Sequence, residues 1–169
     1  MTMPSMTSSP SSAPARRSVL SAWFSPPVIV LTAALATFGA LGLGGVGPWD
    51  SWPMPARWAL AAMFLLTASA RLGPRRAGLI AMVPRVLPKP ALLVAITGAL
   101  EALGAVALVV PATAPVAGWS LAALLVAMFP ANVQAARRAT SIGDRVATPL
   151  GIRTVHQVAF VALAIASAY

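Results

Sequence analysis

The chain has 169 residues, of which 59% are hydrophobic and only 9% are charged. Soluble domains carry about 25% charged residues, so this chain has too little polar surface to coat a water-soluble globule. The absence of cysteine excludes a disulfide framework, thiol redox chemistry and thiolate metal sites. A net charge of +9 would suggest nucleic acid as a partner. Because the cations lie in loops between apolar runs, their placement indicates membrane topology and not nucleic-acid binding.

The first 25 residues are predicted to form a disordered cytoplasmic tail. Residues 1–14 consist mainly of Ser, Thr, Pro and Met without periodicity, which is typical of segments that cannot bury a core. The following run ARRSVLS is similar to a twin-arginine export signal. Ser25-Pro26-Pro27 separates the arginine pair from the next apolar run, so we do not expect a cleaved signal peptide.

Residues 26–169 are predicted to form a polytopic, all-α membrane helix bundle. Apolar runs of about 20 residues match the hydrocarbon thickness of a bilayer. The second run has only thirteen apolar residues between Arg57 and Arg71. It spans only if a helix starts at Pro55 and both arginines extend to the interfaces. The five expected spans are about 28–46, 55–72, 91–110, 116–136 and 152–169.

The distribution of basic residues agrees with this count. With the N-terminus inside the cell, eleven of the twelve Arg and Lys residues fall on the cytoplasmic side and only Arg57 falls outside. This is the positive-inside pattern. High Ala, Arg and Pro usage suits a GC-rich bacterial genome, so we expect a multi-pass protein of the bacterial inner membrane. An aromatic belt is then expected at the outer interface, formed by Trp49, Trp52, Trp58 and Trp119.

The loop between the second and third spans contains the apolar, proline-interrupted run LIAMVPRVLP. Two interpretations stay open for residues 71–90. The run can be an interfacial or re-entrant segment, or it can be a surface loop that its prolines stiffen.

Glu101 is the one charge-capable side chain in Ala91–Val110. Counting about 1.5 Å per residue from Pro90 places it roughly 16 Å deep, near the middle of a ~30 Å hydrocarbon core. Hydrocarbon favours the neutral form of an acid, so we expect Glu101 to face the bundle interior. It is either a proton-handling or ligand-handling acid, or a structural, protonated hydrogen-bond donor. Small residues beside it let another helix backbone approach closely: Gly98, Ala102 and Ala105.

Further polar residues fall in the cytoplasmic half of the spans. We expect Glu101 to face a pocket that opens to the cytoplasm and is lined by Asn132, Gln157 and Arg71. Pro130 is expected to kink the fourth span, because a proline cannot donate to the carbonyl four residues earlier. Two more candidate ligand-binding residues lie close to Gln157 in the sequence: Arg153 and His156.

Structural roles are open for most of these residues. Arg71 and Arg153 can act as interfacial anchors. His156 can be a packed imidazole, and one histidine without any cysteine gives no basis for a metal or haem site. Hydrogen bonds between helices are the expected role of three others: Thr67, Thr97 and Gln134.

Three stretches resemble the DoxX-like family of small bacterial membrane proteins. They are AMVPRVLPKPALLVAITGALEALGAVALVVP, GWSLAALLVAMFPANVQAA and TPLGIRTVHQVAFVALA, and the resemblance covers about Trp58–Ala168. It implies a four-helix core made of the second to fifth spans, with 28–46 as an added N-terminal span. Relatives often have a Gly and a His near the end of the first core helix, where this chain has TASAR, so a role for that His does not carry over. The positions that match the family pattern are Glu101, Pro130, Asn132, Arg153 and Gln157.

The family takes its name from a small subunit of a thiosulfate–quinone oxidoreductase. The resemblance therefore implies an accessory or quinone-interacting subunit of a membrane oxidoreductase, with a diffusible quinone as the candidate cofactor and a membrane or redox protein as partner. In that role Glu101 would exchange a proton, and Asn132 and Gln157 would bind a carbonyl group. Two alternatives remain: a small proton-coupled carrier, and a non-enzymatic assembly or stress factor whose basic loops bind anionic lipid or a partner.

Overall fold

The structure of the protein is a computed structural model that describes residues 23–137, 141–142, 145–146 and 148–169. The predicted tail, residues 1–25, therefore lies almost entirely outside the described residues. The described chain is helical apart from a two-residue antiparallel ladder between β1 (Ser141–Ile142) and β2 (Arg145–Val146). The helices are α2 (Pro26–Leu43), the 3-10 helix η1 (Gly47–Asp50), α3 (Met54–Ser69), α4 (Arg76–Met82), α5 (Pro90–Val109), α6 (Ala114–Arg137) and α7 (Leu150–Ala166).

Each of the five predicted spans is a helix that begins within two residues of its predicted start. Within the described ranges, α2, α5 and α6 are long and apolar enough to cross a membrane. Helix α7 is apolar but shorter, with 17 residues, and α3 has 16 residues. The protein is thus a helical membrane protein with three long apolar helices.

Prolines explain where several of these helices begin. Pro26 is the first residue of α2, Pro90 is the first residue of α5, and Pro55 is the second residue of α3. A proline fits the first turn of a helix because the N–H it lacks would have no partner there, and its fixed φ angle suits the helix. Pro130 is the exception, since α6 continues through it to Arg137.

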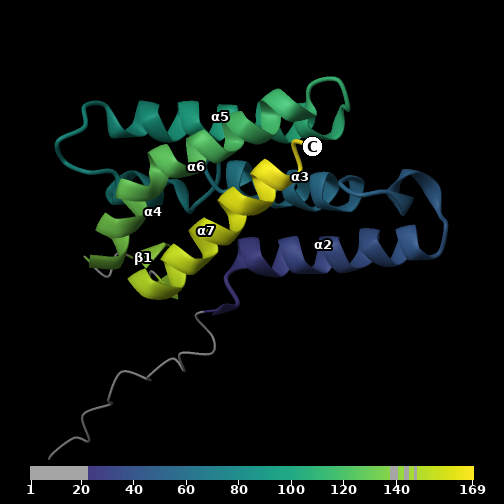
Figure 1. The fold of residues 1–169 in the computed structure, drawn as a ribbon. Helices are drawn as coiled ribbons and strands as arrows, with labels where there is room; N and C mark the ends of the chain where they lie inside the picture. Colours follow the sequence, from purple (N-terminus) through teal and green to yellow (C-terminus); the bar gives the residue numbers. More distant parts are fainter. Residues whose placement is uncertain (1–22, 138–140, 143–144, 147) are drawn as a thin grey trace, which may run out of the picture.

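Helix α3 lies at the centre of the bundle (Figure 1). It packs against α2 and α5 and also contacts α7, while α6 packs against α5 and α7. Leu60, Met63 and Phe64 of α3 are almost completely buried. Helix α2 buries only Leu31, so it is a peripheral helix of the bundle.

A glycine brings α6 and α7 close together. A β-carbon added at Gly118 of α6 would lie 2.7 Å from the carbonyl oxygen of Ala164 and 2.9 Å from the β-carbon of Ala168. No side chain fits in that space, so the contact requires glycine. Such close approach over small residues is typical of helix packing in membranes.

The bundle has two distinct ends (Figure 1). The connections from α3 to α5 and from α6 to α7 lie at one end, together with the start of α2. The α2–α3 and α5–α6 connections and the C-terminus lie at the other end. We call the first the basic end, because among the described residues it carries Arg71, Arg75, Arg76, Arg85, Lys89, Arg137 and Arg153.

The connection between α3 and α5 is partly helical. It contains α4, which packs against α5, α6 and β1. Met82 is buried, and the side-chain amide of Gln134 on α6 donates a 2.8 Å hydrogen bond to the carbonyl oxygen of Val83. The segment is therefore docked on the end of the bundle, and Gln134, which was predicted to bond to another helix, bonds to the residue that follows α4.

The opposite end contains an aromatic cluster and a buried arginine. Trp49 stacks on Phe38 at a centroid distance of 5.3 Å and meets Trp58 edge-on at 6.3 Å. The prediction that Arg57 extends outward to the interface is wrong, because this side chain is only 7% exposed. Its Nε donates a 2.8 Å hydrogen bond to the carbonyl oxygen of Ser167. A carbonyl near the end of α7 is a free acceptor, and this acceptor lies within reach of α3.

Candidate functional site

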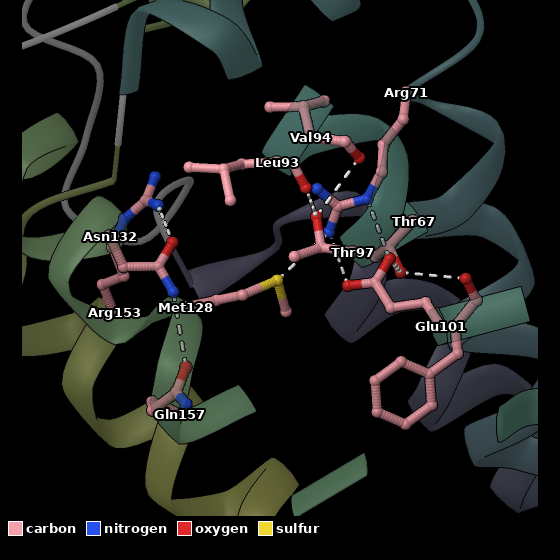
Figure 2. A network of polar contacts seen from close by, with 11 residues as sticks. Thr67, Arg71, Leu93, Val94, Thr97, Glu101, Met128, Asn132, Arg153 and Gln157 are labelled. Atoms are coloured by element: carbon pink, nitrogen blue, oxygen red, sulfur yellow. Dashed lines mark hydrogen bonds and ion pairs between the residues drawn. The ribbon is translucent and has the colours of Figure 1, made fainter. Parts of the chain in front are cut away.

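Glu101 forms a buried ion pair with Arg71 (Figure 2). The side chains are 3% and 11% exposed, respectively. The Nη2 of Arg71 lies 2.6 Å from Oε1 of Glu101, and its Nε lies 3.1 Å from Oε2. The hydroxyl of Thr67 on α3 lies 3.1 Å from the same Oε2, and Arg71 lies in the turn that follows α3. The contacts therefore join α3 and the turn after it to α5, and Glu101 faces the bundle interior as its depth in the span predicts.

The contacts of Glu101 are those of a carboxylate that accepts hydrogen bonds. Each oxygen faces an N–H group of the guanidinium, which cannot accept a proton in return. Two parallel N–H···O bonds are the geometry that Arg and carboxylate groups favour. A protonated Glu101 could direct its O–H only toward the Thr67 hydroxyl oxygen, and it would give up the charge that pairs with the guanidinium. The geometry thus favours the ion pair over the protonated-donor interpretation.

Arg71 does not extend to the interface as an anchor. It turns inward because the Glu101 carboxylate offsets the loss of hydration that burial imposes on a cation. Gly98, one turn before Glu101, makes this possible. A β-carbon at position 98 would overlap Cδ of Arg71 and lie 3.3 Å from its Nε. The small side of α5 was predicted to admit another helix backbone, and at Gly98 it instead admits an arginine side chain.

A second polar cluster joins α6 to α7. The Nη1 of Arg153 donates a 2.8 Å hydrogen bond to Oδ1 of Asn132. The Nδ2 of Asn132 lies 3.4 Å from Oε1 of Gln157. Gln157 itself is buried, with 9% exposure. Arg153 was predicted as a possible anchor at the membrane interface. Its side chain instead bonds to Asn132 of α6.

Met128 lies between the two clusters (Figure 2). Its sulfur is 3.4 Å from Nη2 of Arg71, and it precedes Asn132 by one helical turn on α6, which puts both on one face. The sequence predicted a single pocket lined by Glu101, Asn132, Gln157 and Arg71. The structure has two separate polar clusters instead, and the Met128 thioether lies between them. Nothing in the sequence singled out Met128, because a methionine in a span is usually a packing residue.

The second cluster contains N–H groups with unused hydrogen-bonding capacity. The Nε of Arg153 and the Nε2 of Gln157 are buried and find no hydrogen-bond partner among the described residues. Buried polar atoms are nearly always hydrogen-bonded in proteins. These two donors lie on one helix, one turn apart, beside Asn132. Together they could bind an acceptor such as a carbonyl or carboxylate oxygen.

The remaining predicted residues lie outside both clusters. His156 contacts Trp23 edge-on at a centroid distance of 5.6 Å and stacks on Phe160 at 6.1 Å, so it is packed among aromatic rings. The hydroxyl of Thr97 bonds to backbone carbonyls of its own helix, not to another helix. Pro130 lines a surface hollow of about 290 Å³ with Val133, Gln134 and Arg137.

Comparison with known proteins gives a match to a family model. No curated protein and no solved structure matches the chain. One family model, described as "Domain of unknown function (DUF8561)", matches residues 60–168. The matched region contains both polar clusters and most of α3, and it excludes α2. Because the match covers more than half of the chain, the protein belongs to the DUF8561 family.

Proposed function

We propose that the protein crosses the bacterial inner membrane five times, with its N-terminus in the cytoplasm, and that α3, α5, α6 and α7 form a DoxX-like core. Neither Arg57 nor Arg71 extends to an interface, so in this proposal α3 crosses because each arginine is paired inside the bundle instead. Alternation of the connections between two ends of the bundle supports this topology (Figure 1). The basic end then faces the cytoplasm, in agreement with the positive-inside rule. The family match and the DoxX resemblance cover nearly the same residues and both leave out α2. Helix α2 is then an added span.

We propose that this membrane protein binds a quinone as an accessory subunit of an oxidoreductase. The observation that carries the proposal is the pair of unpartnered buried donors, Arg153 Nε and Gln157 Nε2. A quinone carbonyl is an acceptor on an otherwise apolar molecule, so it can reach such donors from the lipid phase. Its binding would restore the hydrogen bonds that burial takes from these N–H groups. Asn132 positions both residues through its own contacts.

The Arg71–Glu101 pair supplies the charged part of the proposed site. Reduction of a quinone to a quinol takes up two electrons and two protons, so the Glu101 carboxylate could assist only by first taking up a proton from the basic end and then passing it on. Glu101 is the acid nearest to the second cluster among the described residues, with Met128 between them. The chain has no cysteine and one histidine, so a partner protein supplies the electrons in this proposal.

The Arg71–Glu101 ion pair argues against the alternative that the protein is a proton-coupled carrier. A proton-coupled carrier needs an acid that loads and releases a proton on both sides of the membrane. Glu101 is buried and held by a guanidinium on its basic-end side. The binding proposal needs no such exchange with both sides, so it fits the buried pair better.

Quinone content of the purified protein tests the proposal. The wild-type protein, purified in mild detergent, should retain quinone detectable by mass spectrometry of a solvent extract. Gln157→Met removes one donor at similar volume and should weaken retention about tenfold. Thr32→Val is the matched control, since the Thr32 hydroxyl bonds only to its own helix α2. Equal quinone content in all three proteins, or none in the wild type, would refute the proposal.

A further inference from the structure

The connection between α4 and α5 forms a hollow of about 550 Å³ on the surface of the bundle. Apolar side chains and prolines line most of it, and one arginine contributes a positive charge. The hollow touches the start of α5, because Pro90 is both a lining residue and the first residue of that helix. The lining residues are Ile80, Ala81, Val83, Pro84, Arg85, Leu87 and Pro90.

Its position is at the level of lipid headgroups. Helix α5 is one of the three helices long and apolar enough to span a membrane, so its first residue marks the boundary of the hydrocarbon core. Leu87 and Val86 are 45% and 89% exposed beside this boundary. Apolar side chains that remain exposed next to a spanning helix are covered by acyl chains, since contact with water is unfavourable for them.

Charge identifies the kind of lipid. Residues 71–90 contain five basic side chains and no acidic one. Arg85 is exposed and lines the hollow, and an arginine matches a phosphate through two N–H···O bonds. A hollow with an apolar floor and an arginine at headgroup level is complementary to a phosphate attached to acyl chains. We propose that this hollow binds one anionic phospholipid, with its phosphate on Arg85 and an acyl chain against Leu87.

A second feature connects the hollow to α6. The side chain of Gln134 donates to the carbonyl oxygen of Val83, which lines the hollow. Gln134 also lines the neighbouring hollow of about 290 Å³ on α6. This hydrogen bond ties the α4–α5 connection to the long apolar helix α6. A lipid bound here would brace α4 against α5 and α6.

Native mass spectrometry of the full chain tests the proposal. The protein is reconstituted with phosphatidylcholine and an equal amount of phosphatidylglycerol, and the lipids that remain bound are identified. The wild type should retain one phosphatidylglycerol molecule in preference to phosphatidylcholine. Loss of one basic contact near a membrane surface corresponds to about a fivefold weaker retention, which is the result expected for Arg85→Gln.

Two further variants distinguish lipid binding in this hollow from general electrostatic attraction of anionic lipid to the basic segment. Arg76→Gln removes an equal charge from the same segment at an exposed position that does not line the hollow, and it should change retention less than twofold. Leu87→Ser should weaken retention although it keeps every charge, and inorganic phosphate should not displace the lipid. Equal losses in Arg76→Gln and Arg85→Gln, displacement by phosphate alone, or unchanged retention in Arg85→Gln would each overturn the proposal. Unaltered helical circular dichroism shows that each variant is folded.

Discussion

At the scale of single residues, the least expected feature is that Arg57 of α3 and Arg71 in the turn after α3 both point into the protein. Arg57 reaches a carbonyl near the end of α7, and Arg71 reaches a carboxylate on α5. An arginine at the end of a span normally extends its charge toward water. Here a specific acceptor on a neighbouring helix is available to each, and a charge-assisted hydrogen bond replaces hydration.

Removing one member of the Arg71–Glu101 pair should therefore destabilise the protein strongly. Glu101→Gln leaves a buried guanidinium without a counter-charge, which corresponds to a loss of about 3 kcal/mol in the free energy of unfolding. The double variant Arg71→Met, Glu101→Leu removes both charges and should recover most of that loss. Reversible unfolding in mixed detergent micelles measures both values. Wild-type stability of Glu101→Gln would show that the ion pair contributes nothing.

At the scale of helices, glycines decide how closely neighbouring elements meet, and two of them do so in different ways. Gly118 admits the backbone of α7 against α6, whereas Gly98 admits the side chain of Arg71 against α5. Both lie on buried faces of their helices. Gly39 on α2 differs, since a β-carbon there would meet nothing within 4 Å. Packing therefore requires glycine at positions 118 and 98, but not at position 39.

The contrast between these glycines gives a prediction. Gly98→Ala should push Arg71 away from Glu101 and lower the free energy of unfolding by about 1–3 kcal/mol. Gly39→Ala should leave stability unchanged or raise it by up to about 1 kcal/mol, because alanine is the better helix former. Unfolding of the two variants under the same detergent conditions provides the comparison. If Gly98→Ala is as stable as Gly39→Ala, Arg71 does not depend on the space beside Gly98.

At the scale of the whole molecule, the two ends of the bundle differ in charge and in aromatic content. Basic residues gather at the end with the α3–α5 connection, while Trp49 and Trp58 pack with Phe38 at the other end. This asymmetry is what a membrane protein needs to adopt one orientation. The proposed five-span topology places the basic end, with the proposed lipid site at Arg85, in the cytoplasm.

The natural absence of cysteine makes the topology easy to test. Ala77→Cys places a thiol at the basic end, and Leu43→Cys places one at the other end; both positions are exposed. A membrane-impermeant maleimide applied to intact spheroplasts should label Leu43→Cys, and it should label Ala77→Cys only after the membrane is permeabilised. The reverse pattern would mean that the N-terminus lies outside. Labelling of both positions in intact spheroplasts would exclude five complete spans.

The sequence alone was sufficient to place the five main helices, because apolar runs and helix-starting prolines such as Pro26 and Pro90 are local signals. It also placed Glu101 on a buried face, since a carboxylic acid at that depth is too unfavourable in contact with lipid. The prediction that the protein is a DoxX-like, quinone-interacting subunit stays a proposal.

Only the tertiary structure decided which residues meet. The pairing of Arg71 with Glu101 depends on how α3 and α5 are rotated and on the space that Gly98 leaves, and neither is a property of one helix. The separation of Asn132 and Gln157 from Glu101 depends on Met128 of α6 lying between them. The inward direction of Arg57 depends on α7 ending beside α3. Periodicity in a sequence gives the buried face of a helix, whereas its partners follow from the packing of all the helices together.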